Sequence, residues 1–380
     1  NADQEYFADG ITEDLIIDLS RLSNLQVLAR NTSFKYKSLA VDPTTLKNDL
    51  SVSHFLEGSI RRAGDQIRIT SQLTDVDKGT PIWAERYDRK LDDIFAVQDD
   101  VVKNIISALS IHLTASEETA LSITKAGNVE AYDLFLQGQW LGNIRTRQDN
   151  ALAQQFYRES IQKDPDYSRP YGALAVAITH AVNAQWSDTP TLDRDRALEL
   201  ARKAISLDNT SPHAYWALGF THLFREEYQQ AEDIITEAVK IAPNYADGYG
   251  LLALIKNHVW KAEEAIEYTE KAMKLNPLYT YEYLYNLGVG YYTLEQYDKA
   301  IDYLQKALER NPNFSRARMF LSASYTGSGM DDEAEWETQQ VLIQRPQVSI
   351  TKIEEESAYA DHPVRDRFVA QLRKSGLPEK

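Results

Sequence analysis

Cysteine is absent from the 380 residues. Without thiols the chain has no disulfides, no thiolate metal ligands and no cysteine nucleophile. The sequence also has no run of about 18 apolar residues, so we expect no direct membrane insertion. Basic residues are scarce: 41 Lys and Arg against 57 Asp and Glu give a net charge of −16. Because nucleic acids bind through Lys and Arg that neutralise phosphate, we expect no nucleic-acid partner.

Local catalytic and metal-binding motifs are missing as well. None of the seven histidines falls in an H-E-x-x-H spacing, and no G-x-S-x-G occurs. Arg61, Arg62 and Arg86 are basic residues that could bind an anion, but a solvated strand face accounts for them better. We therefore predict no catalytic residue, no bound metal and no cofactor, and we expect that the chain is not an enzyme.

What the sequence does contain is an internal repeat. Four prolines, at positions 243, 277, 312 and 346, are spaced by 34, 35 and 34 residues. Each closes a stretch with small residues at matching places, such as Ala231 with Ala238 and Ala300 with Ala307. Small residues let two helices approach, and proline stops the second helix. The spacing therefore predicts helical pairs that must stack on neighbours to bury their apolar stripes.

These marks resemble the tetratricopeptide repeat (TPR) family over roughly residues 131–348. Four units are strong, and two degenerate units precede them, which makes about six. Residues 349–380 fit a carboxy-terminal capping helix and tail, since Phe368, Val369 and Leu372 form an apolar stripe that Gly376 ends.

Residues 1–126 do not share the repeat and predict an α+β domain. Alternating apolar and polar residues flank the turn residues Ala63-Gly64-Asp65, which indicates a hairpin. Helical spacing of apolar residues predicts an amphipathic helix near the start of the chain and a longer one at the end of the domain. The predicted helices cover residues 9–22, 44–50 and 92–113, and the predicted strands cover residues 25–29, 54–62, 66–74 and 82–87.

Two runs in this part resemble the TolB-amino-terminal-like domain of bacterial signalling proteins: EYFADGITEDLIIDLSRLSNLQVLARNTSFKYK and FLEGSIRRAGDQIRITSQLTDVDKGTPIWAERYDRKLDDIFAVQDDVV. In that family the domain is followed by TPRs, as in the non-catalytic region of class III adenylate/guanylate cyclases and of CadC-like regulators. The resemblance implies three parts: a TolB-like α+β domain (1–126), an all-α TPR superhelical solenoid (127–348) and a cap (349–380). An apolar first strand that usually precedes these residues is missing, so we expect an open sheet edge at which a homodimer could form.

The TPR resemblance also implies a binding groove, because certain places on the first helix of each unit face the concave side of a TPR array. For the units from Ser168 onward these places are occupied largely by aromatic and acidic residues. The predicted groove residues are His180, His213, Trp216, Phe220, Asp247, Asn257, His258, Glu282, Tyr285 and Tyr292. Aromatic side chains at such places either bind a partner or pack the repeats, and the sequence leaves both open.

The sequence thus predicts a non-catalytic module that binds a protein or peptide, with a sensory or scaffolding role in bacterial signal transduction. Two alternatives stay open. The chain could be the regulatory part of a class III cyclase whose catalytic domain lies elsewhere, or a free-standing cell-envelope scaffold. If the transmembrane architecture of the resembled family holds, the chain is expected on the periplasmic side of the inner membrane. If it does not hold, the chain is expected in the cytoplasm.

Overall fold

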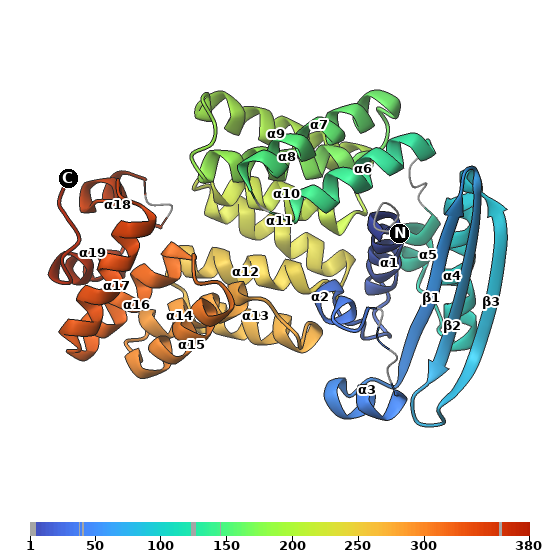
Figure 1. Ribbon diagram of the computed structural model, residues 1–380, viewed down its shortest axis with the longest axis horizontal. Helices are drawn as coiled ribbons and strands as arrows, with labels where there is room; N and C mark the ends of the chain where they lie inside the picture. Colours follow the sequence, from blue (N-terminus) through green and yellow to red (C-terminus); the bar gives the residue numbers. More distant parts are fainter. Residues whose placement is uncertain (1–4, 38, 40–41, 123–126, 145, 357–358) are drawn as a thin grey trace. The chain divides into compact units, whose positions relative to one another are not determined.

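The computed structural model describes the chain except residues 1–4, 38, 40–41, 123–126, 145 and 357–358 (Figure 1). The chain forms two compact units. The first comprises Asn1–Thr221 and Glu237–Tyr245, and the second comprises His222–Thr236 and Ala246–Lys380. Two helices, α10 (Pro212–Leu223) and α11 (Tyr228–Ile241), contribute residues to both units.

The first unit begins with helices around an antiparallel sheet in the order β1-β2-β3. In chain order these elements are α1 (Glu5–Ser20), α2 (Arg30–Phe34), α3 (Pro43–Leu50), β1 (His54–Ala63), β2 (Gln66–Asp75), β3 (Thr80–Lys90), the short 3-10 helix η2 (Leu91–Asp93), α4 (Ile94–Ala108) and α5 (Ala115–Ser122). The predicted hairpin is confirmed: Ala63 pairs with Gln66, and Gly64 between them has a φ of 64°, which glycine adopts without strain. The sheet is consistent with an α+β amino-terminal part.

One face of the sheet is covered by α4, which packs against β2 and β3. Burial alternates along β2, so that Ile67 and Ile69 point to the same side and are nearly inaccessible. On α4 the residues facing the sheet recur at helical spacing, as with Val97 and Val101. The strand residues therefore supply one apolar face, and the small sheet is stabilised by burying it under a helix.

Two sequence predictions in this part are wrong in detail. Residues 25–29 form no strand, because the Leu25 carbonyl accepts a hydrogen bond from Asn244 Nδ2 at 2.6 Å instead of joining a ladder. The helix predicted to run to residue 113 ends at Ala108. There Ser110 adopts a left-handed φ of 52°, which an α-helix cannot continue through.

From α6 onward the chain is a succession of helices. In the first unit these are α6 (Val129–Gly142), α7 (Arg147–Lys163), α8 (Ser168–Asn183) and α9 (Pro190–Leu207), and in the second unit α12 (Ala246–His258), α13 (Ala262–Leu275), α14 (Tyr281–Thr293), α15 (Tyr297–Arg310), α16 (Ser315–Ser328), α17 (Asp331–Gln344), α18 (Ile350–Glu356) and α19 (Pro363–Lys374). Even-numbered helices from α6 to α16 are called A helices below, and each packs on the B helix that follows it. The exception is the α10–α11 pair, whose residues are divided between the units.

Close approach within a pair depends on glycine at some positions. A Cβ on Gly288 of α14 would lie 2.6 Å from Leu304 Cγ of α15, closer than side chains tolerate. The turn from A helix to B helix also repeats. It contains one left-handed residue in five of the pairs: Gln185, Glu226, Trp260, Glu295 and Gly329. Local geometry therefore follows the sequence period.

The carboxy-terminal residues form two helices, α18 and α19, where one capping helix was predicted. The apolar stripe of Phe368, Val369 and Leu372 is buried in the core of the second unit. Among the described residues no helix is long and apolar enough to cross a bilayer.

Candidate partner-binding surface

The predicted groove residues all lie on A helices, but they divide between the two units. Those of α8 and α10 belong to the first unit, and those of α12 and α14 belong to the second. Each set is therefore a separate candidate surface.

In the first unit three of the predicted residues form one aromatic cluster. Trp216 stacks on Phe220 with ring centroids 4.9 Å apart and an angle of 11° between the planes. His180, from the neighbouring A helix, lies 5.2 Å from the Phe220 ring. Phe220 is buried, whereas Trp216 and His180 are partly exposed. We call these three residues the aromatic ledge.

The ledge is supported from behind by helix packing. Trp216 and Tyr215 contact a small core of Ala238, Ala242 and Tyr245. His213, the fourth predicted residue of this unit, lies 5.0 Å from the Tyr245 ring. Burial, and then the nearby charges of Arg169 and Arg21, lower the pKa of His213 to about 3, so this ring is neutral at pH 7.

Helix α1 packs against the first A helices of this unit, a contact that the repeat pattern does not predict. Helix α1 packs on α6, where Gly10 accommodates the Leu136 side chain: a Cβ on Gly10 would lie 2.3 Å from it. The Tyr6 hydroxyl donates to Asp133 of α6 at 2.8 Å, and Asp14 forms an ion pair with Arg169 of α8.

Asp14 is the centre of a buried polar network. It is about 5% exposed, and it accepts hydrogen bonds from the Tyr132 hydroxyl at 2.6 Å and from Gln98 Nε2 at 3.2 Å. Tyr132 belongs to α6 and Gln98 to α4, so the network joins the amino-terminal part to the first repeats. The carboxylate is thereby satisfied by donors from three other helices, as a buried charge requires.

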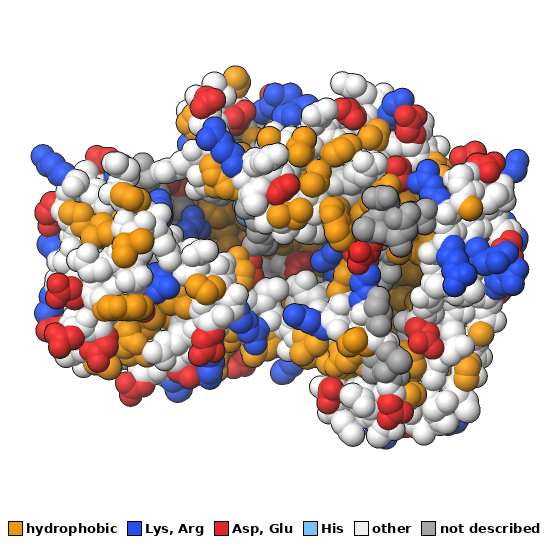
Figure 2. All heavy atoms as spheres, viewed as in Figure 1, with side chains coloured by type: hydrophobic (Ala, Val, Ile, Leu, Met, Phe, Trp, Pro, Cys, Tyr) orange, Lys and Arg blue, Asp and Glu red, His pale blue; other side chains and the backbone are white. Residues whose placement is uncertain are grey.

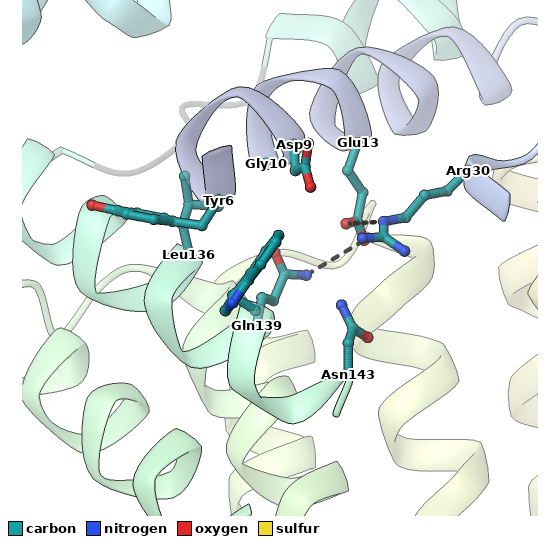
Figure 3. A pocket seen from close by; sticks show the side chains of 9 residues that line it. Tyr6, Asp9, Gly10, Glu13, Arg30, Leu136, Gln139 and Asn143 are labelled. Carbon is teal, nitrogen blue, oxygen red and sulfur yellow. Dashed lines mark hydrogen bonds and ion pairs between the residues drawn. The ribbon is translucent and has the colours of Figure 1, made fainter. Parts of the chain in front are cut away.

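A shallow pocket lies beside this contact, between α1 and α6 (Figure 3). Its polar lining includes Glu13, which pairs with Arg30 Nε at 3.0 Å and accepts a hydrogen bond from Gln139 Nε2 at 3.4 Å. The pocket encloses about 220 Å³ of space that includes open solvent. It is too small for a drug-sized ligand.

In the second unit the predicted residues fall into two groups. Asp247 is exposed and Glu282 is partly exposed. The side chains of His258, Tyr285 and Tyr292 are buried, and each touches residues of the carboxy-terminal region. Asn257 is also buried, and its Nδ2 donates to the Asn286 carbonyl at 3.0 Å, which ties α12 to α14. Whether any of these positions binds a partner stays a prediction.

Two of the three basic residues considered as an anion site, Arg62 and Arg86, form ion pairs within the first unit. Figure 2 shows Lys and Arg side chains gathered over the sheet. There Arg68 and Arg86 both pair with Asp88, at 2.5 and 2.7 Å. Arg62 pairs with Asp133 at 3.0 Å. The described residues contain no cluster of three or more His, Asp or Glu side chains that could hold a metal ion.

Comparison with known proteins identifies the repeats. Tetratricopeptide repeat families match residues 193–255 and 281–314. The chain therefore contains tetratricopeptide repeats, as the proline spacing and the paired helices indicate.

Among curated proteins, 239 residues are 40% identical to a Rhizobium meliloti protein named "Putative adenylate cyclase 3"; this match covers 60% of the present chain and 39% of that protein. A second match is the human mitochondrial import receptor subunit TOM70, 28% identical over 113 residues, or 30% of this chain and 16% of the receptor. The chain thus matches well under half the length of these relatives. Among solved structures, a monomeric mutant of IFIT1 with Gppp-AAAA is 15% identical with a TM-score of 0.51, covering 75% of this chain and 65% of that one. This likeness shows the fold alone.

Proposed function

We propose that this chain is a non-catalytic, protein-binding module with a sensory or scaffolding role, and that it serves as the regulatory part of a bacterial class III adenylate/guanylate cyclase. The TPR matches support the binding role, since TPR units present stacked helical surfaces to partners. The 40% identity to the Rhizobium relative supports the cyclase association. In this proposal the amino-terminal α+β part is TolB-like and the cyclase chemistry resides outside these residues.

The observation that carries the binding role is the aromatic ledge. Trp216 and His180 present partly exposed rings on adjacent A helices, around a buried Phe220. Tryptophan provides a large contact area at low entropy cost, and it is enriched among the residues that dominate binding energy. The net charge of −16 favours a cationic partner through faster, salt-sensitive association. The expected ligand is an apolar or aromatic peptide segment that carries a basic residue.

Panning a random peptide library against the chain tests this. We expect enriched sequences that pair an aromatic residue with Lys or Arg. Trp216→Ala should weaken their binding about thirtyfold, which corresponds to about 2 kcal/mol for a true hot spot. Trp336→Ala is the matched control, because Trp336 is 56% exposed on α17 and lies outside the ledge.

Two outcomes would reject the ledge as the binding surface. One is enrichment of peptides that bind wild type and a well-folded Trp216→Ala equally. The other is a library that yields no aromatic-containing binder. Thermal melts of both variants show whether the substitution unfolds the repeats rather than removing a contact.

The non-catalytic part of the proposal has its own test. The purified chain, incubated with ATP or GTP and magnesium or manganese, should form no cyclic nucleotide. Activity that scales with protein and survives repurification would refute it.

The proposal extends to location and assembly. A regulator of the resembled architecture would lie on the periplasmic side of the inner membrane, and its sheet edge could pair two copies. Reporter fusions to the native gene test the first point, and sedimentation of the chain over a concentration series tests the second.

A further inference from the structure

The carboxy-terminal segment, residues 359–375, lies along A helices of the second unit. Its helix α19 packs on α16, where the Phe368 ring stacks on Phe320 with centroids 4.4 Å apart. The Phe368 ring also makes a T-shaped contact with the Tyr292 ring of α14, with centroids 5.9 Å apart. Arg367 Nη2 donates to the carbonyls of Tyr292 and Thr293, at 3.1 and 3.0 Å. The segment therefore covers the helix surface on which a TPR partner was predicted to bind.

The first residue of the segment occupies an aromatic slot. The Tyr359 ring stacks on His258, with centroids 4.4 Å apart and planes 7° apart. It also stacks on Trp260 at 4.9 Å and 25°. The Tyr359 hydroxyl shares a 2.7 Å hydrogen bond with the Tyr285 hydroxyl. Two of these contacting residues, His258 and Tyr285, are among the predicted groove residues.

The main chain of the segment is bound as well. The Ala360 N–H donates to the His258 carbonyl at 2.9 Å, and Trp260 Nε1 donates to the Ala360 carbonyl at 2.9 Å. A single aromatic anchor with paired main-chain hydrogen bonds beside it is a common way in which proteins hold an extended peptide. The segment thus makes contacts of the kind that a separate peptide ligand would make.

Trp260 provides a second, independent observation. It occupies the left-handed position of the turn between α12 and α13, with a φ of 58°. The equivalent turns carry Gln185, Glu226, Glu295 and Gly329. A bulky residue with positive φ is an outlier, and such strain persists where the surroundings hold it in place. Here the Trp260 ring stacks on Tyr359, and its N–H donates to the Ala360 carbonyl. The strained residue therefore contacts the carboxy-terminal segment directly.

We propose that the carboxy-terminal segment is a built-in ligand of the second unit, and that a partner binds this surface by replacing it with a peptide that presents a tyrosine to the His258, Trp260 and Tyr285 slot. The inference rests on the proposed protein-binding role of the repeats, but it concerns a different surface from the aromatic ledge. A tethered ligand has an effective concentration of about millimolar, so an external peptide must compete with it. Displacement of the segment is then the step that controls access.

The test uses the full chain and a fluorescein-labelled peptide with the sequence of residues 359–375. Tyr359→Ala in the chain weakens the tethered competitor and leaves the slot residues intact. It should tighten binding of the labelled peptide about tenfold, since apparent affinity scales with the fraction of open molecules. Tyr303→Ala, on the B helix α15, is the matched control and should not change binding. A probe peptide whose own tyrosine is replaced by alanine should lose the gain.

A second variant guards against misfolding. Trp260→Gly relieves the left-handed strain, as Gly329 does in its turn, and removes one stacking ring together with the indole donor. It should abolish the dependence of probe binding on tyrosine. Hydrogen exchange should also show the segment opening before α14 and α16. Equal probe affinity for wild type, Tyr359→Ala and Tyr303→Ala would overturn the proposal, as would a segment that exchanges only when the whole unit unfolds. Either result would leave the aromatic ledge and its library test unaffected.

Discussion

Replacing Arg169 with methionine should destabilise the first unit strongly. The substitution keeps much of the side-chain volume but leaves the Asp14 carboxylate buried without its cation. Burial opposes the charge of Arg169, yet the Asp14 carboxylate raises the pKa of Arg169, which shows how closely the two groups depend on each other. Breaking a buried ion pair by removing one partner typically costs 3–5 kcal/mol.

The contacts of Asp14 and Arg169 narrow the expected loss in free energy of unfolding. Asp14 would keep its hydrogen bonds from Tyr132 and Gln98, which favours the lower end of the range, about 3 kcal/mol. The Arg169 guanidinium also lies 4.6 Å from the centroid of the Phe135 ring, and loss of that cation–π contact adds about 0.5–1 kcal/mol. The expected loss in free energy of unfolding is therefore about 3–4 kcal/mol.

Urea unfolding, with hydrogen exchange of α1 as the reporter of the first unit, measures this loss. Lys163→Met is the matched control, because Lys163 pairs with Glu130 at 2.8 Å but both side chains are about half exposed. That surface pair should contribute less than about 1 kcal/mol. Adding Asp14→Asn to Arg169→Met should restore about 1–2 kcal/mol by removing the unpaired charge. If Arg169→Met and Lys163→Met destabilise equally, the network does not anchor α1.

Three further outcomes are expected. Burial opposes ionisation of Glu117, but hydrogen bonds from Ser23 and Thr114 lower its pKa to about 2. Glu117→Gln should therefore reduce the free energy of unfolding by about 2 kcal/mol at pH 7, and by progressively less as the pH falls from 4.5 towards 2. Urea midpoints measure this difference. The pKa of His213 is also lowered, and because the charged form of histidine is the protonated one, the unfolded chain binds a proton below pH 6.5 that the folded chain does not. The free energy of unfolding of the wild type should therefore fall by about 2 kcal/mol relative to that of His213→Phe between pH 6.5 and 4. Parallel pH profiles of the two proteins would refute this. Gly288→Ala should destabilise the second unit by about 1–3 kcal/mol in thermal melts through overpacking against α15, and an unchanged melt would show that the pair can separate.

The sequence predicted the parts of the fold that depend on short-range pattern. Residues 63–65 identify a hairpin because a glycine turn separates two alternating runs, and the two strands pair antiparallel across that turn. Proline spacing likewise identified the helical pairs, because every unit needs small residues and a helix stop at the same places. The predictions were wrong where the backbone conformation departs from the one that the apolar spacing indicates. Apolar residues at 111 and 113 continue a helical spacing, yet the left-handed Ser110 ends the helix before them.

The candidate surfaces were harder to predict, because their exposure depends on segments outside the repeat. Asp14 lies within the helix predicted over residues 9–22, but its carboxylate reaches Arg169, 155 positions away. Tyr359 has no neighbour in the sequence that marks it as an aromatic anchor, and its contacts with Tyr285 and His258 span 74 and 101 positions of the chain. The TPR period therefore predicts candidate partner-facing residues, whereas contacts made by α1 and the carboxy-terminal segment, which lie outside the repeat, appear only in the structure. Regulation of binding in such a module would act on these two covering segments rather than on the repeats themselves.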